Sequence, residues 1–155
     1  MPRSSNSVQL HRVLRAPASR IYQAFLNPDA LCRWLPPRGY IGKIDRFDRF
    51  NPQQGDSFHM TFTAFANGHS HSFTSYFVEL VPYKKIRLCD EFDDQALTGK
   101  MSKTITLRSV KCGTELRILH EGLPQAIPAE KCYLGWQESL LQLADLVEPD
   151  FSQAD

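Results

Sequence analysis

One amphipathic helix near the end of the chain, preceded by a long run of strand patterns, constrains the fold most. In the segment before Pro149, apolar side chains recur about every 3.6 residues, the period of one helix face. The stripe comprises Tyr133, Trp136, Leu140, Leu143, Ala144 and Val147, and Leu134 and Leu141 widen it. Such a helix is long enough to cross a sheet, since it rises ~1.5 Å per residue. It needs an apolar surface on which to lie.

The segments before this helix supply that surface, because they alternate like half-buried strands. From Phe58 to Phe65, apolar residues alternate with polar ones. Asn67-Gly68 follows, a pair typical of type I′ hairpin turns, in which both residues have positive φ. Strands are predicted over residues 8–16, 40–50, 58–65, 72–81, 85–92, 103–111 and 114–123. Together they predict an antiparallel sheet with one apolar and one mostly polar face.

Two short helices are expected after the first strand. The first follows Pro17 and carries Ile21, Tyr22 and Phe25 at helical spacing. The second ends at Pro36-Pro37, since proline cannot continue a helix. The order strand, two helices, strands and one long helix predicts an α+β domain. Its curved antiparallel sheet, of six to seven strands, wraps around the C-terminal helix.

Composition and charge narrow the class of protein. A chain of 155 residues suits one domain, which we expect over residues 8–148, between a flexible N-terminus (1–7) and a C-terminal tail (149–155). The net charge of +1 lacks the excess of positive charge that is typical of nucleic-acid-binding proteins. No segment approaches the ~18 apolar residues of a membrane span.

Cysteine use and the chain start indicate the compartment. Cys32, Cys89, Cys112 and Cys132 match no zinc-binding spacing. The first ten residues, MPRSSNSVQL, lack the apolar core of a secretory signal. We therefore expect reduced thiols in a cytoplasmic protein.

Several motifs in a fixed order carry a family resemblance. They are RVLRAP (12–17) followed by IYQAF, RWLPPRG (33–39), VELVPYKKIRL (78–88), and GTELRILHEGLP (113–124) followed by GWQESLLQL. Together they resemble the family named after the activator of the heat-shock-protein ATPase, within the START-like (SRPBCC) superfamily. The resemblance spans residues 8–148 and implies the helix-grip fold, with a cavity between the sheet and the last helix.

The resemblance also implies a range of functions. Relatives bind lipids, sterols, polyketides, plant hormones and other apolar molecules, and a few catalyse reactions in the cavity. The chaperone activator itself carries a further domain that this sequence lacks. A chaperone partner is therefore an alternative that we do not favour, and pairing of two copies into a homodimer stays open.

Alternation along the strands and helices predicts which side chains face the cavity or pack as core. A helix in a strongly curved sheet cannot fill the whole concavity, so large aromatic side chains would line the remainder. The candidates are Trp34, Phe58, Met60, Phe62, Tyr76, Val78, Leu88, Asp90, Ile105, Leu107, Ile118, His120, Trp136, Leu140 and Leu143.

Three polar candidates could orient a ligand. His120 is in phase with Ile118 and could bond a ligand, carry a proton, or be satisfied by backbone. Asp90 is in phase with Leu88, and Arg12 or His120 could neutralise it; it could equally belong to the exposed acidic run 90–94. Tyr76 could offer its hydroxyl to the cavity or lie at its rim.

The sequence gives little support for a metal site. His69-x-His71 lacks a third metal ligand, and the run DEFDD lacks the glycine and terminal glutamate of a calcium loop. We expect no metal and no cofactor. The sequence predicts binding of a hydrophobic or amphipathic, lipid-like small molecule. An enzyme using His120 and Asp90, and a protein-interaction module with an exposed apolar patch, are the alternatives.

Overall fold

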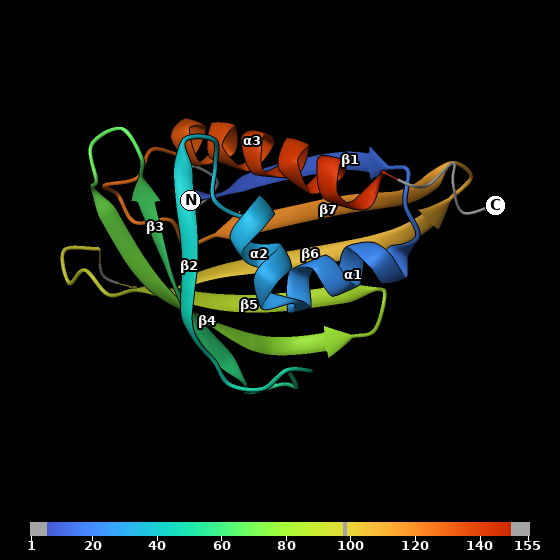
Figure 1. Cartoon of the computed structure of the whole chain (residues 1–155), viewed down its shortest axis with the longest axis horizontal. Helices are drawn as coiled ribbons and strands as arrows, with labels where there is room; N and C mark the ends of the chain where they lie inside the picture. Colours follow the sequence, from blue (N-terminus) through green and yellow to red (C-terminus); the bar gives the residue numbers. More distant parts are fainter. Residues whose placement is uncertain (1–5, 98, 150–155) are drawn as a thin grey trace.

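The computed structural model describes residues 6–97 and 99–149 (Figure 1). The predicted flexible segments at 1–7 and 149–155 therefore lie mostly outside the described residues. Along the chain the elements are β1 (Val8–Leu14), α1 (Ala18–Leu26), α2 (Pro28–Trp34), β2 (Tyr40–Phe47), β3 (Ser57–Ala64), β4 (Ser70–Val81), β5 (Lys85–Phe92), β6 (Met101–Val110), β7 (Gly113–Glu121) and α3 (Ala129–Val147). None of the described helices is both long and apolar enough to cross a bilayer.

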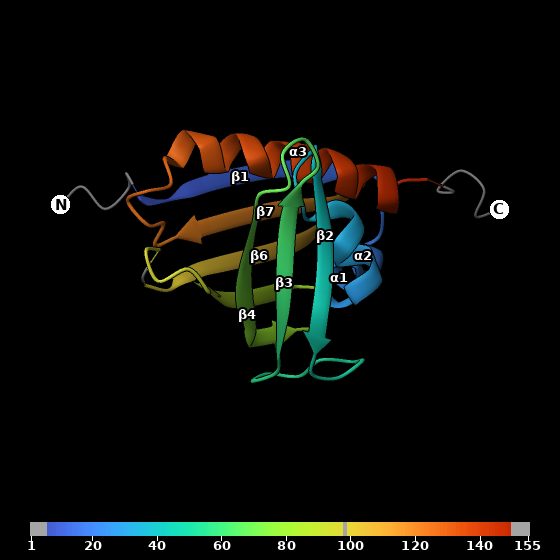
Figure 2. The ribbon, with the colours of Figure 1, turned by 60° about the vertical axis from the view of Figure 1, so that its left-hand side comes forward.

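The strands form one antiparallel sheet in the order β1-β7-β6-β5-β4-β3-β2. The sheet is curved and does not close: β2, β3 and β4 run steeply across the direction of β1, β7 and β6 (Figure 2). Helix α3 lies along the β1 side, and α1 and α2 fill the concave side next to it (Figures 1 and 2). The predicted α+β helix-grip architecture is confirmed.

The hairpin between β3 and β4 forms, but its turn differs from the prediction. A loop longer than two residues joins Ala64 to Ser70, and the Gly68 N–H bonds the Ala64 carbonyl at 2.8 Å. Gly68 has φ +76°, whereas Asn67 is not in the positive region. The prediction of a type I′ turn is wrong, because one glycine at the end of a longer loop reverses the chain.

Helix α3 buries a narrower stripe than its sequence predicted. Trp136, Leu140, Leu143, Ala144 and Val147 are buried as expected. The flanking residues of the predicted stripe, Tyr133, Leu134 and Leu141, are exposed. The helix touches the rest of the protein along one side only, so residues at the edges of a wide stripe face solvent.

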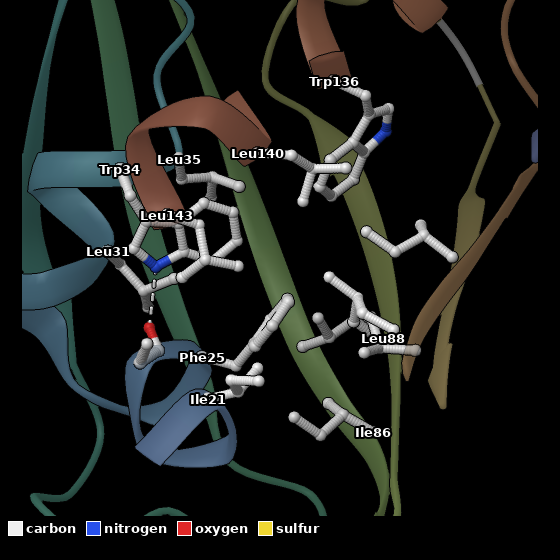
Figure 3. Packing of buried hydrophobic residues seen from close by; sticks show 14 of the residues in the cluster. Ile21, Phe25, Leu31, Trp34, Leu35, Ile86, Leu88, Trp136, Leu140 and Leu143 are labelled. Carbon is white, nitrogen blue, oxygen red and sulfur yellow. Dashed lines mark hydrogen bonds between the residues drawn. The ribbon is translucent and has the colours of Figure 1, made fainter. Parts of the chain in front are cut away.

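The core lies where the three helices meet the concave face of the sheet (Figure 3). Trp34, Ile86 and Leu143 have no exposed surface, and they come from α2, β5 and α3. Ser139 and Gln142 of α3 donate hydrogen bonds to carbonyls of residues 34–36, at the end of α2 and just after it. These contacts fix the middle of α3 against the segment that ends α2.

On the outer face, one carboxylate links three neighbouring strands. Glu115 of β7 bonds His11 Nε2 of β1 at 2.7 Å, Arg108 Nε of β6 at 2.9 Å and Arg117 of β7 at 3.2 Å. The hydrogen bonds from Arg108 and His11 lower the pKa of Glu115 to about 2. Deprotonated Glu115 therefore stabilises the fold at neutral pH.

We expect Glu115→Gln to lower stability at neutral pH and to flatten its acid dependence. Because the folded pKa is depressed, this stabilisation is present above the unfolded pKa of about 4.5 and is lost as pH falls through about 2. Urea unfolding across this pH range measures the effect. A gap between variant and wild type that stays constant down to pH 2 would contradict the assignment.

Candidate ligand-binding cavity

A cavity of about 460 Å³ lies between the sheet and the first half of α3. Its walls come from strands β3 to β7, the start of β2, the segment after α2 and the chain that leads into α3. Residues that line it include Leu35, Pro37, Tyr40, Phe62, His71, Phe73, Asp90, Phe92, Met101, Lys103, His120, Leu123, Ile127, Cys132, Gly135, Trp136 and Ser139. The volume falls in the ~300–1,000 Å³ range of small-molecule pockets.

Four of the residues predicted from sequence line this cavity: Phe62, Asp90, His120 and Trp136. Most of the others are buried in the packed core beside it and do not line it. These are Trp34, Phe58, Met60, Leu88, Ile105, Leu107, Ile118, Leu140 and Leu143. Alternation identified the inward face of the sheet, but it could not separate the filled part of that face from the hollow part.

Two predicted residues point the wrong way. Tyr76 and Val78 are 39% and 43% exposed. The inward phase of β4 is instead carried by Phe73, Ser75 and Phe77. Both phases of this strand contain an aromatic residue, and a shift of one residue exchanges the two faces. The prediction that Tyr76 and Val78 face inward is wrong, and the hydroxyl of Tyr76 does not reach the cavity.

One wall of the cavity is a nearly continuous surface of aromatic rings. Phe62 lies 5.3 Å from Phe73 and 5.6 Å from His71, both edge to face. His71 contacts Tyr40 at 6.2 Å and Phe92 at 5.9 Å in the same manner. Partial burial lowers the pKa of His71. Edge-to-face packing fixes the rings relative to one another, so the wall has a defined shape.

A buried ion pair lies at the cavity. Lys103 Nζ of β6 is 2.8 Å from Asp90 Oδ2 of β5, and both side chains are almost fully buried. The Ser75 hydroxyl of β4 donates to Asp90 Oδ1 at 2.6 Å. The ammonium also lies 5.9 Å from the Phe73 ring centroid and 5.8 Å from that of Trp136. Each Asp90 oxygen thus has a partner, and the charges cancel.

Sequence reasoning missed Lys103, although it had a usable signal. Lys103 is in phase with Ile105 and Leu107, which were predicted to face inward. A buried carboxylate nearby requires a cation. The predicted partners of Asp90, Arg12 and His120, are both wrong, because the ion pair joins the neighbouring strands β5 and β6.

His120 forms a second buried polar group at the cavity. The Trp136 indole donates to its Nδ1 at 3.0 Å, and the Cys132 sulfur lies 3.5 Å from the same nitrogen. Burial raises the pKa of the Cys132 thiol to about 11, so this thiol is protonated. Nδ1 is therefore an acceptor, and the imidazole proton lies on Nε2. Burial, with Lys103 second, lowers the pKa of His120 to about 4.

The second imidazole nitrogen of His120, Nε2, makes no hydrogen bond in the described structure. Among the described residues, His120 Nε2 is a buried side-chain nitrogen without a hydrogen-bond partner. The predicted alternative for this residue, satisfaction by a backbone carbonyl, does not occur. A buried donor without a partner costs about 1–3 kcal/mol.

The cavity does not offer a metal site within the part of the chain described. No three His, Cys, Asp or Glu side chains gather there in a way that could hold a metal ion. His69 and His71 do not act as a pair, since His71 joins the aromatic wall and His69 does not line the cavity.

Comparisons with known proteins agree with this architecture. Protein CV1439 from Chromobacterium violaceum is 52% identical, covers 97% of this chain and 100% of its own, and superposes with a TM-score of 0.90. A Rhodobacter sphaeroides protein (21% identity, 94% of each chain) and the AHSA1 protein from Silicibacter pomeroyi (16% identity, 90% of this chain, 95% of its own) share the fold, with TM-scores of 0.77 and 0.75.

The family assignment follows from a family model that matches most of the chain. No curated protein matches the chain. The family model described as Activator of Hsp90 ATPase homolog 1-like protein matches residues 15–148, which include every helix and strand after β1. The chain belongs to this family.

Proposed function

We propose that the protein binds a hydrophobic or amphipathic small molecule in the cavity between the sheet and α3. The observation that carries the proposal is a cavity of about 460 Å³ with an aromatic wall and a few buried polar groups. Ligand sites commonly combine a mainly apolar lining with a few placed polar groups. Burial of apolar ligand surface would drive binding, at roughly 25 cal/mol per Å² before the costs of association.

The polar groups favour binding over acid–base catalysis. Asp90 is committed to Lys103 and Ser75, and no hydrogen bond connects it to His120 in the described structure. The pKa of His120, about 4, keeps this imidazole neutral near pH 7. A general acid or base works best with a pKa near the operating pH.

The cavity also favours a small molecule over a protein partner such as a chaperone. An interaction module was expected to show an exposed apolar patch and no pocket.

We further propose a cytoplasmic location. Its support is four cysteines that are unpaired in the described structure, as suits a reducing compartment.

Filling the cavity from α3 tests the proposal. Gly135 lines the cavity, and a Cβ there would meet only Pro37 Cγ, at 4.0 Å. We expect Gly135→Leu to raise stability by about 0.5–1 kcal/mol, because glycine is a poor helix former. The same change should weaken binding of the neutral probe phenylnaphthylamine by about tenfold or more, since methylene-sized changes in a pocket have effects of this order.

Two matched variants serve as controls. Asp145→Leu adds the same side chain at an exposed position of α3, away from the cavity. Tyr76→Ala removes an exposed ring from the outer face of β4. Both should bind the probe like wild type, as measured by fluorescence titration. Equal binding by Gly135→Leu and wild type, or no binding by wild type, would refute the proposal.

A further inference from the structure

The two polar groups at the cavity share an excess of hydrogen-bond donors. Lys103 has three N–H donors, and its only polar partner in the described structure is Asp90. His120 keeps its Nε2 proton without a partner. Both Asp90 oxygens already accept a bond, and His120 Nδ1 accepts from Trp136. At these buried groups the remaining capacity therefore consists mainly of donors, which calls for an acceptor on the ligand.

The charges restrict what kind of acceptor fits. The Lys103 ammonium is neutralised by Asp90, and His120 is neutral. The other charged residues that line the cavity, Lys131 and Glu138, are one of each sign. Lys131 is exposed and Glu138 is half-buried, whereas Lys103 and Asp90 are buried. A charged ligand group beside the buried pair would therefore be desolvated without a counter-ion of its own. A cationic ligand would also meet Lys103, which already lies beside the Phe73 and Trp136 rings.

We infer that the ligand is an uncharged aromatic or aliphatic molecule with one buried acceptor, such as the carbonyl of a ketone, ester or amide. The acceptor takes a hydrogen bond from Lys103 or His120, and the apolar part lies against the rings of Phe62, Phe73 and Phe92. The inference rests on the proposed function and names the chemical class of its ligand.

A matched ligand set tests this class. Butylbenzene, butyrophenone, phenylbutanoate and phenylbutylammonium have the same number of carbons, and they carry respectively no polar group, a carbonyl, a carboxylate and an ammonium. Displacement of phenylnaphthylamine from the wild-type protein gives the Kd of each. We expect butyrophenone to bind more tightly than either charged compound.

Variants isolate the donors from the apolar contacts. Lys103→Met combined with Asp90→Thr removes the ion pair without leaving a buried charge, and the new hydroxyl can pair with Ser75. In this variant the Kd ratio of butylbenzene to butyrophenone should fall about tenfold, since hydrogen bonds from charged groups contribute on this scale. His120→Asn keeps an acceptor for Trp136 but loses the Nε2 donor, whereas His120→Gln keeps a donor near Nε2. The asparagine variant should lose more of the ketone preference.

The outcomes separate the two proposals. No binding of any of the four compounds to wild type would refute the proposed function. Binding of butylbenzene and butyrophenone with the same Kd ratio in wild type and in all variants would refute the ligand class and leave the proposed function intact. Tighter binding of phenylbutanoate than of butyrophenone would refute the inference that the ligand is uncharged.

Discussion

Lys103→Met is expected to destabilise the protein by about 3–5 kcal/mol, because it leaves Asp90 buried without its cation. The two side chains are only 6% and 5% exposed, so bulk water solvates the remaining carboxylate poorly. Methionine has nearly the length of lysine, and the variant therefore removes the charge while creating little empty volume. Urea unfolding, with both midpoint and slope measured, gives the change in free energy.

The double variant separates the ion pair from the packing. Adding Asp90→Thr to Lys103→Met should restore most of the lost stability, since removing both charges of a buried pair is often neutral. Ser75 and Asp90 face each other across β4 and β5, as Thr61 and Ser72 do across β3 and β4. Thr61 and Ser72 already form a hydroxyl pair at 2.7 Å. A single variant within about 1 kcal/mol of wild type would show that Asp90 is not held as a buried anion.

Trp34→Ala should also cost about 3–5 kcal/mol, the usual range for loss of a buried tryptophan. Trp34 has no exposed surface and packs edge to face on Phe25 at 4.8 Å. Its indole donates to the Ala24 carbonyl at 2.9 Å (Figure 3). Ala24 lies in the last turn of α1, where carbonyls lack a partner within the helix. The side chain thus joins α1 to α2.

Trp34→Phe distinguishes these two contributions. It keeps most of the apolar contact and removes the N–H donor, so we expect a loss of about 1–3 kcal/mol. Trp34 does not line the cavity, so Trp34→Phe should bind phenylnaphthylamine like wild type. Loss of less than about 1 kcal/mol in Trp34→Ala would contradict the assignment of this residue to the core.

The architecture was predictable because each element carries its own periodic pattern. The stripe on α3 and the alternation along β3 and β7 each specify an element without knowledge of the others. The phase of β4 was not predictable, because Tyr76 and Val78 form as plausible an inward set as Phe73 and Phe77. The observed phase brings the Ser75 hydroxyl to Asp90 of β5, a contact between two strands that the pattern of β4 alone does not reveal.

The chemistry of the cavity was only partly predictable for a similar reason. His120 and Asp90 stood out as polar residues in apolar phases. Their partners depend on register: Lys103 lies opposite Leu88, diagonal to Asp90 across β5 and β6. Nothing in a single sequence fixes that register. The extent of the cavity depends on the distance of α3 and of the segment after α2 from the sheet. That distance is also set by tertiary packing.

The central claim is that a small molecule binds between the sheet and α3, and amide chemical-shift mapping during titration with butyrophenone tests it most directly. We predict the largest shifts in the cavity-lining parts of β5, β6 and β7 and in the first half of α3, near Asp90, Lys103, His120 and Gly135. At the same ligand concentration Gly135→Leu should show much smaller shifts, because it binds more weakly, whereas Tyr76→Ala should show the wild-type shifts. Shifts confined to the outer face of the sheet, or no shifts up to the solubility limit of butyrophenone, would contradict the account.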